Sequence, residues 1–128
     1  MRVAKQLSVT LPNKPGQLAS LCKKLAAAKV NIRAISVVEA TEQGIVRLVA
    51  DKSSVALGVI EKAGLGCVVS QVVLVEMANK PGVLAKVATK LSKAKINIQY
   101  AYGSSGPGAR EAIAVLGVED VKKARQLA

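Results

Sequence analysis

The sequence predicts an α+β protein built from two copies of a small β-α-β-β-α-β module, each an antiparallel sheet with its helices on one face. Two observations support this. Residues 13–19 return almost unchanged at 79–85, and 12 of 25 positions are identical between residues 13–37 and 79–103. Along the chain, the spacing of the apolar residues also changes between the period typical of strands and the period typical of helices. A repeat this long suits a duplicated domain better than a solenoid. We expect domains over residues 1–70 and 71–128.

The first module begins with a strand and a helix. Residues 6–11 alternate polar and apolar side chains, which is the period of a half-buried strand. A turn over residues 12–16 ends that strand. From Gln17 onward the apolar residues follow a helical stripe, which predicts a helix of about 14 residues. Pro15 is expected at or near the first turn of this helix, where its missing N–H costs nothing.

Two strands, a second helix and a long apolar run complete the first module. Apolar and β-branched residues predict strands over residues 30–39 and 44–50, joined by a hairpin at residues 41–44. A second helix follows and is ended by Gly64. The apolar run over residues 66–77 is expected to hold the last strand of the first module and the first strand of the second.

The second module repeats this order but is shorter. After a first strand and the turn at residues 79–82, a helix leads to a strand over residues 96–102. Residues 103–108 form a hairpin loop, residues 111–116 the next strand, and Asp120 opens the last helix. No sixth element is visible. The second sheet therefore either remains at three strands or borrows one.

Composition narrows the class of protein. Hydrophobic residues make up 51% of the chain, with no Trp, Phe or His, so the core must be aliphatic. Cys22 and Cys67 have neither CxxC nor metal-ligand spacing, which favours two buried, reduced thiols in a cytoplasmic protein. Met1 leads straight into a strand, without the apolar run of a signal peptide. No stretch approaches the roughly 18 apolar residues of a membrane span.

The charge and the residue types exclude most chemistries. A net charge of +11 would suit nucleic acid or another anionic partner. The lysines, however, lie on the polar faces and later turns of predicted helices, as on a solvated surface. Aromatic residues for base stacking make up only 2% of the chain, so nucleic acid is not expected. Without histidines or a carboxylate cluster, we expect no enzyme, no metal site and no cofactor.

The repeated turn is the best candidate for a binding site. In each copy a strand runs into Asn-Lys-Pro-Gly and a helix starts at once. The first N–H groups of a helix have no internal partner, and with the helix dipole they can hold a carboxylate or phosphate. Gly16 and Gly82 would let a ligand approach the backbone. The same residues also make an ordinary turn, so both interpretations stay open.

An Asn-Ile pair follows 15 residues after each of these glycines. Asn31 and Asn97 begin the strand after the helix and could offer an amide to a polar ligand. Each could equally be a turn residue in a left-handed conformation.

The motif Asn-Lys-Pro-Gly-x-Leu-Ala, with a helix ending in Ala-Lys-Val/Ile-Asn-Ile, resembles the ACT domain family of amino-acid metabolism. The resemblance implies a ferredoxin-like fold for each module and a free amino acid bound at an interface between modules, often in a homodimer. It implies a site made by the turn before the first helix, with the Asn-Ile pairs on the opposite side. The residues carried over are Asn13, Lys14, Pro15, Gly16, Gln17, Leu18, Asn31 and Ile32 in the first module, and Asn79, Lys80, Pro81, Gly82, Val83, Leu84, Asn97 and Ile98 in the second.

We therefore expect a regulatory protein that senses a free amino acid and acts on an enzyme or regulator. Two alternatives remain: a non-catalytic protein-interaction module with an empty turn, and a basic nucleic-acid-associated regulator. The missing last strand is a departure from the family pattern, and it concerns the geometry of the second site more than that of the first. The sequence leaves open which amino acid binds and whether one or both turns are occupied.

Overall fold

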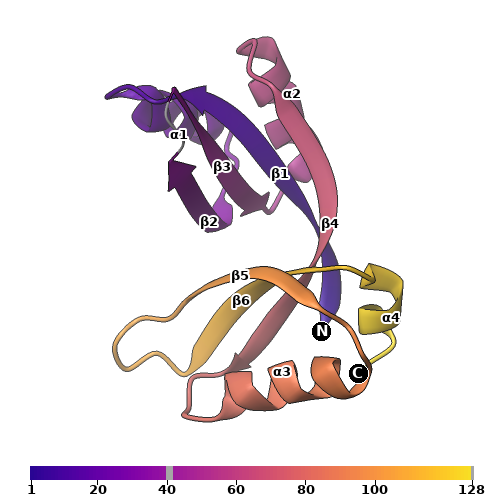
Figure 1. The fold of residues 1–128 in the computed structure, drawn as a ribbon. Coiled ribbons are helices and arrows are strands. Elements are labelled where there is room, and N and C mark those ends of the chain that lie inside the picture. Colours follow the sequence, from indigo (N-terminus) through magenta and orange to yellow (C-terminus); the bar gives the residue numbers. More distant parts are fainter. Residues whose placement is uncertain (40–41, 128) are drawn as a thin grey trace. The chain divides into compact units, whose positions relative to one another are not determined.

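The computed structural model describes residues 1–39 and 42–127 of the chain. The α+β class is confirmed, and the order of elements in each half follows the prediction (Figure 1). The elements are β1 (Arg2–Pro12), α1 (Gln17–Ala27), β2 (Ile32–Glu39), β3 (Gln43–Ala50), α2 (Ser53–Lys62), β4 (Cys67–Ala78), α3 (Val83–Lys93), β5 (Ile98–Ser104), β6 (Glu111–Val118) and α4 (Val121–Arg125).

The chain divides into two compact units. One unit, called the N-unit here, comprises residues 5–70, and the other, the C-unit, comprises residues 1–4 and 71–128. The first four residues, which we assigned to the first module, thus belong with the second. The apolar run that was expected to hold two strands forms one continuous strand, β4, which contributes residues to both units.

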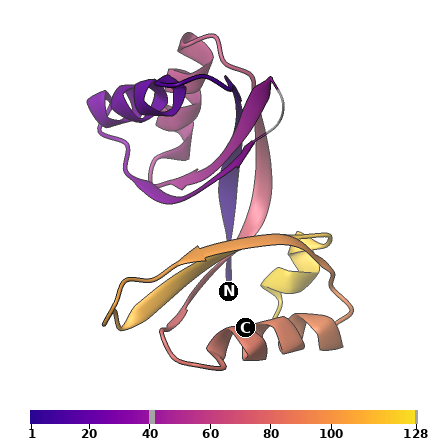
Figure 2. The same cartoon turned by 60° about the vertical axis from the view of Figure 1, so that its left-hand side comes forward.

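The N-unit has the strand order of a ferredoxin-like module, β2-β3-β1-β4. β1 pairs antiparallel with β3, placing Val9 opposite Val46, and β3 pairs antiparallel with β2. Helices α1 and α2 lie on one face of the sheet (Figure 2). The hairpin predicted at residues 41–44 begins outside the described residues, but the two strands that it would join are paired up to Glu39 and Gly44.

The aliphatic core of the N-unit lies between the helices and this face of the sheet. Alternate residues of β1 and β3 point into it, as a strand period of two requires. The helices contribute positions on one stripe each. The buried cluster consists of Leu7, Val9, Leu11, Leu21, Leu25, Val30, Val46, Leu48, Ala56 and Ile60.

The C-unit completes its sheet with a borrowed strand. Its order is β1-β4-β6-β5, so the N-terminal residues of β1 take the place of the sixth element that the second half lacks. Met1 packs against the core of the unit, and Arg2 Nη2 donates to Glu76 Oε1 of β4 at 2.9 Å. Of the two outcomes left open by the sequence, a three-stranded or a completed sheet, the structure has the second.

The core of the C-unit repeats the chemistry of the first. Its buried residues are Val73, Val75, Leu91, Ile96, Ala114, Leu116, Val118 and Ala124. Asp120 caps α4 as predicted, because its side chain accepts a hydrogen bond from the Lys123 amide at 3.0 Å. Among the described residues, no helix is long and apolar enough to cross a membrane.

Candidate functional site

The two repeated turns have the same backbone geometry. Gly16 precedes α1 with φ 86° and ψ −9°, and Gly82 precedes α3 with φ 88° and ψ −11°. This left-handed conformation is one that glycine adopts freely. Each glycine is the N-cap residue, so Pro15 lies just outside the helix rather than in its first turn. Because glycine has no side chain to cap the helix, the first N–H groups of α1 and α3 are not capped from this position.

Backbone hydrogen bonds anchor both turns to the neighbouring hairpin in the same way. The Asn13 amide donates to Glu42 O at 3.0 Å, and the Asn79 amide donates to Arg110 O at 2.9 Å. The two lysine amides donate back to Pro12 O and Ala78 O, each at 2.9 Å. The duplication of the sequence is therefore a duplication of backbone structure at this place.

The asparagine side chains, in contrast, have different partners. In the N-unit, Asn13 Nδ2 donates to Glu39 Oε1 at 3.0 Å. In the C-unit, Asn79 Nδ2 donates to the backbone oxygen of Ala109 at 3.0 Å. A carboxylate thus lies beside the first turn and a neutral carbonyl beside the second.

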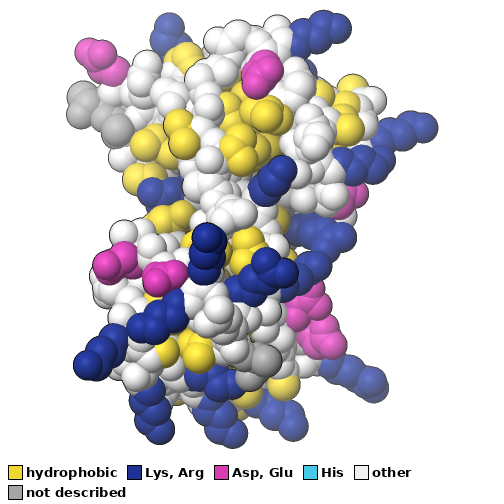
Figure 3. Space-filling model, turned by 90° about the vertical axis from the view of Figure 1, so that its right-hand side faces the viewer, with side chains coloured by type: hydrophobic (Ala, Val, Ile, Leu, Met, Phe, Trp, Pro, Cys, Tyr) yellow, Lys and Arg dark blue, Asp and Glu magenta, His cyan; other side chains and the backbone are white. Residues whose placement is uncertain are grey.

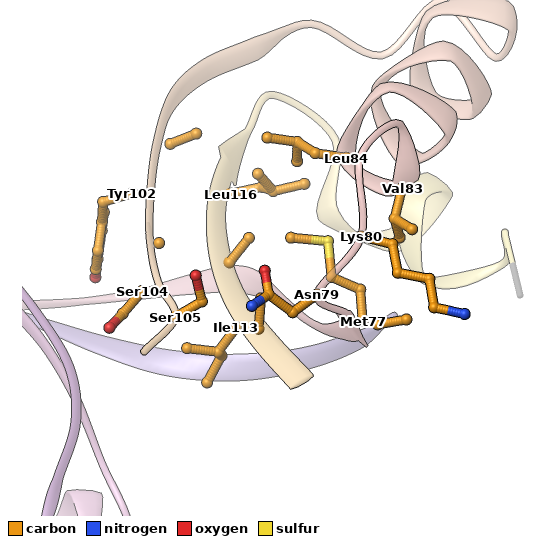
Figure 4. A pocket seen from close by; sticks show the side chains of 15 residues that line it. Met77, Asn79, Lys80, Val83, Leu84, Tyr102, Ser104, Ser105, Ile113 and Leu116 are labelled. Carbon is orange, nitrogen blue, oxygen red and sulfur yellow. The ribbon is translucent and has the colours of Figure 1, made fainter. Parts of the chain in front are cut away.

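A cavity of about 380 Å³ opens beside the second turn (Figure 4). This volume is within the usual range for small-molecule sites. The end of β4, the start of α3, β5 and β6 surround it. Its lining residues are Met77, Ala78, Asn79, Lys80, Val83, Leu84, Ala101, Tyr102, Gly103, Ser104, Ser105, Ala112, Ile113, Ala114 and Leu116.

Most of this lining is apolar, and its strand residues are small. Ala101 and Gly103 lie on β5 opposite Leu116 and Ala114 of β6, and these β6 residues belong to the core beneath the helices. Cross-strand partners share a face of the sheet, so the small β5 residues lie on the helix side. In Figure 4 the Lys80 side chain extends away from the apolar lining, and Lys80 is exposed. The arrangement offers an apolar surface beside a helix N-terminus.

Four of the predicted site residues line this cavity: Asn79, Lys80, Val83 and Leu84. Pro81 and Gly82 shape the turn without lining it. The other lining residues, which come from the end of β4, from β5 and β6 and from Ser105 after β5, were not predicted from the sequence. A signal for them was present, because the repeats differ at these positions: residues 101, 103 and 105 are small, whereas their counterparts 66 residues earlier are large.

The Asn-Ile pairs lie at the other end of each helix. α3 has 11 residues, so Asn97 is separated from the turn by about 16 Å of helix. The Asn97 oxygen accepts from the Glu119 amide, and the Asn31 amide donates to Asp51 Oδ1 at 2.9 Å. Ile32 and Ile98 pack against the cores. Within one unit, these residues and the turns are not brought together, and their role in ligand binding stays a prediction.

The left-handed turn residues after the helices are lysines rather than asparagines. Lys29 and Lys95 have φ values of 60° and 58°. The Lys29 amide donates to Ala26 O at 2.9 Å and the Lys95 amide to Ser92 O at 2.9 Å, closing the end of each helix. The alternative interpretation of Asn31 and Asn97 as left-handed residues is therefore wrong.

The cysteines do not form a reactive site in the described chain. Both thiols are free, and both are half-buried rather than buried. Cys22 is next to Leu21, which faces the core, and a step of one residue turns a side chain about 100° around the helix. Burial, and secondarily the charge of Glu61, raise the pKa of Cys67. Within residues 1–39 and 42–127, no group of three or more His, Cys, Asp or Glu side chains could hold a metal ion.

Among the described residues, Lys80 is the one basic residue that lines this cavity. On the face shown in Figure 3, lysine and arginine side chains are spread over both units, with acidic and apolar side chains between them.

One of the two tyrosines is used in packing, because a Cβ at Gly117 would collide with the ring of Tyr100. Such cross-strand cover of a glycine is a structural use of an aromatic residue.

Comparisons with known proteins agree with this fold. A family model described as an ACT domain pair matches residues 1–128. Protein BT0572 from Bacteroides thetaiotaomicron is 30% identical with a TM-score of 0.89, covering 98% of this chain and 85% of that one. The ligand-free regulatory subunit of aspartate kinase from Thermus thermophilus is 16% identical with a TM-score of 0.70, covering 99% and 95%.

The regulatory subunit of aspartate kinase from Thermus flavus is 18% identical with a TM-score of 0.62, covering 99% of this chain and 94% of its own. At this level of identity, the likeness to both aspartate kinase subunits concerns the fold. A comparison with curated proteins found no match.

Proposed function

Because this chain belongs to the family of ACT domain pairs, we propose that it is a non-catalytic regulatory protein that binds a free amino acid. The proposed site is the cavity beside the second repeated turn, at the N-terminus of α3. One observation carries the proposal: a cavity of about 380 Å³ joins a helix N-terminus to an apolar lining. A free amino acid has a carboxylate that suits the helix N-terminus and a side chain that can suit the apolar lining.

The helix N-terminus suits the carboxylate of the ligand. The first N–H groups of α3 lack partners within the helix, and the helix dipole places partial positive charge there. Gly82 has no side chain to obstruct an approach to these groups. Lys80, also at the turn, adds a formal positive charge. We expect the carboxylate to accept a hydrogen bond from the Leu84 amide and to compete for the Val83 amide with Lys80 O, its present acceptor at 3.4 Å.

The apolar lining suits an aliphatic side chain. Met77, Leu116 and the alanines of β6 offer no charge that could pair with a charged ligand side chain. Burying an ionised group against such a surface would be unfavourable, whereas each buried CH₂ contributes about 0.8 kcal/mol. We therefore expect the site to favour L-valine, L-leucine, L-isoleucine or L-methionine over acidic and basic amino acids.

We propose that a second ACT module, from a second copy of the chain, closes the site in a homodimer. Leu84 borders the cavity and is 51% exposed, so part of its apolar surface is open to a partner. A partner module that covers Leu84 would give the ligand its remaining contacts. Ligand binding would then shift the population of a dimeric state and so alter a regulated enzyme or regulator.

A thermal-shift screen of the twenty amino acids, followed by calorimetry, tests this function. A ligand at about 100 times its Kd stabilises by about 2.7 kcal/mol. The variant Ala101→Leu should abolish the shift, because the larger side chain fills the cavity from an exposed position on β5. Gln99→Leu, on the same strand and outside the lining, is the matched control. A screen without any shift would refute the proposal.

One observation favours a second candidate, a protein-interaction module. β2 is a terminal strand of the sheet, and large apolar side chains on β2 and β3 are exposed. Ile35 is 41% exposed, Val37 54%, Val38 45% and Ile45 38%. An exposed apolar strand at a sheet edge commonly pairs with another chain. If this is the main function, Val38→Lys should change the oligomeric state in light scattering, and no amino acid should shift the melting temperature.

We do not favour nucleic acid as a ligand. The basic side chains in Figure 3 are dispersed rather than aligned along a groove. Tyr100, which could stack on a base, already covers Gly117. Binding that weakens steeply and linearly with the logarithm of salt concentration would contradict this judgement.

A further inference from the structure

We infer that the chain has one amino-acid site, in the second repeat, and that side chains of the first repeat occupy the corresponding position there. This inference rests on the proposed function of the cavity beside the Asn79–Gly82 turn. It concerns the first repeat, whose turn has the same sequence and backbone geometry. Residues opposite the two turns decide which of them can accept a ligand.

The register of the strands shows which residues correspond. In the N-unit, β1 places Val9 opposite Val46, and in the C-unit, β4 places Val75 opposite Ala114. Val9 and Val75 are equivalent in the 66-residue repeat, so Val46 corresponds to Ala114. On the next strand, Ile35 and Val37 correspond to Ala101 and Gly103 by the same repeat.

The apolar lining of the second repeat is replaced by larger side chains in the first. Val37 lies opposite Val46, as Gly103 lies opposite Ala114. In the second repeat these two positions carry a hydrogen atom and a methyl group, and in the first they carry two isopropyl groups. The extra carbon atoms stand on the same face of the sheet as α1, where the second repeat has its cavity, and Val37 is 54% exposed there.

The neighbouring pair of positions shows the same difference. Ile35 lies opposite Leu48, as Ala101 lies opposite Leu116. Leu48 on β3 and Leu116 on β6 are both fully buried, so the two units have the same buried leucine at this position. The side chain opposite this leucine differs: it is an isoleucine in the N-unit and an alanine in the C-unit. The first repeat therefore has less room for the side chain of a ligand.

The carboxylate position differs as well. Glu39 corresponds to Ser105, and its Oε1 accepts a hydrogen bond from Asn13 Nδ2 at 3.0 Å. The first turn thus already has a carboxylate beside it, supplied by the protein. A ligand carboxylate arriving there would meet a like charge. In the second repeat, the corresponding side chain is a neutral serine that lines the cavity.

Two independent differences therefore close the first repeat to an amino acid: bulk from Ile35 and Val37, and negative charge from Glu39. The backbone geometry that its turn shares with the second repeat then has a structural role and not a ligand-binding one. The chain would then differ from a symmetric pair of sensors, because the second repeat has small residues beside its turn and the first has larger ones and a carboxylate.

Calorimetry and NMR on the 128-residue chain test this inference, with L-leucine, L-valine, L-isoleucine and L-methionine as probes. We expect one bound probe molecule per wild-type chain. In ¹H–¹⁵N spectra, we expect the amide shifts of residues 79–84 to move and those of residues 13–18 to stay. The NMR readout uses the wild-type protein alone, so it does not depend on whether any variant folds.

Exchange of residues between the repeats is the second arm. Ile35→Ala/Val37→Ala/Glu39→Ser should create a second site and move the amides of residues 13–18 on titration. Ser105→Glu should lower the affinity of the native site by about tenfold or more, because it adds the like charge. Ser104→Glu, at the last residue of β5 and the neighbouring position of the lining, tests whether a carboxylate elsewhere in the lining has the same effect.

The outcomes separate this inference from the proposed function. Binding by wild type at residues 13–18, alone or together with residues 79–84, would overturn the inference and leave amino-acid binding intact. A triple variant that folds, by circular dichroism, but gains no second site would overturn the role assigned to its three side chains. The absence of binding by any probe would refute the proposed function itself, and the inference with it.

Discussion

Gly82→Ala and Gly16→Ala should destabilise the chain equally but differ in their effect on ligand binding. Both glycines have φ near +87°, at 88° and 86°, where an L-residue costs about 1–2 kcal/mol. Alanine also restricts the unfolded chain, which offsets about 0.4–1 kcal/mol. A Cβ at either position meets no atom within 4 Å, so steric collision adds nothing. We expect a net loss of about 1 kcal/mol for each variant.

Thermal and chemical denaturation measure the first half of this prediction. A loss of about 1 kcal/mol lowers the Tm of a domain of this size by about 4–8 °C. Ligand calorimetry measures the second half. Gly82→Ala should weaken binding about tenfold, the value of one lost hydrogen bond to a charged group, because its Cβ stands beside the amides that hold the carboxylate.

Gly16→Ala should leave the affinity unchanged, because the first repeat does not bind. Each half of the prediction can fail separately. An unchanged Tm for either variant would refute the left-handed conformation as the reason for glycine. An equal loss of affinity in both variants would refute the assignment of the site to the second turn alone.

Three further predictions concern stability and reactivity. Leu91→Ala removes a fully buried side chain from the C-unit core and should cost about 2–5 kcal/mol in urea denaturation; a loss below 1 kcal/mol would contradict its place in the core. Asp120→Ala removes the cap of α4 and should cost about 1 kcal/mol, whereas Asp120→Asn, which can still accept the bond, should cost less. Because its pKa is raised, Cys67 should react with iodoacetamide more slowly at pH 8 than an ordinary cysteine and accelerate as pH rises, measured in Cys22→Ser by mass spectrometry.

Much of the fold was predictable because its signals are local. The alternation over residues 6–11 and the apolar stripe of α1 depend on neighbours within a few positions, and both elements are present, although α1 has 11 residues rather than about 14 and β1 extends to Arg2 and Pro12. The left-handed conformation of Gly16 and Gly82 was not predicted, although it too depends on a single residue. The duplication then carried each of these predictions to the second half of the chain.

The borrowed strand was not predictable in this way. Arg2 and Glu76 are 74 positions apart, and the segment Met-Arg-Val-Ala carries no mark of its partner. A strand edge offers the same row of N–H and C=O groups to any extended segment. Which segment fills it is decided by packing against the C-unit core, as Met1 does.

The candidate site likewise has one part that was predictable from the sequence and one part that was not. The residues of the turn at 79–84 could be named from the sequence, because a helix N-terminus is defined by the chain that enters it. The apolar lining could not, because it depends on the pairing of β5 with β6 and on which side chains share a face.

By itself, the sequence determined the two repeats and the order of strands and helices, and it located the two turns, one of which we propose as part of the binding site. These features depend on interactions within a few residues of one another, which a linear pattern records. Only the tertiary structure decided that residues 1–4 complete the C-unit sheet, and that a cavity lies beside the second turn, because strand pairing and side-chain volume are properties of segments distant in the chain.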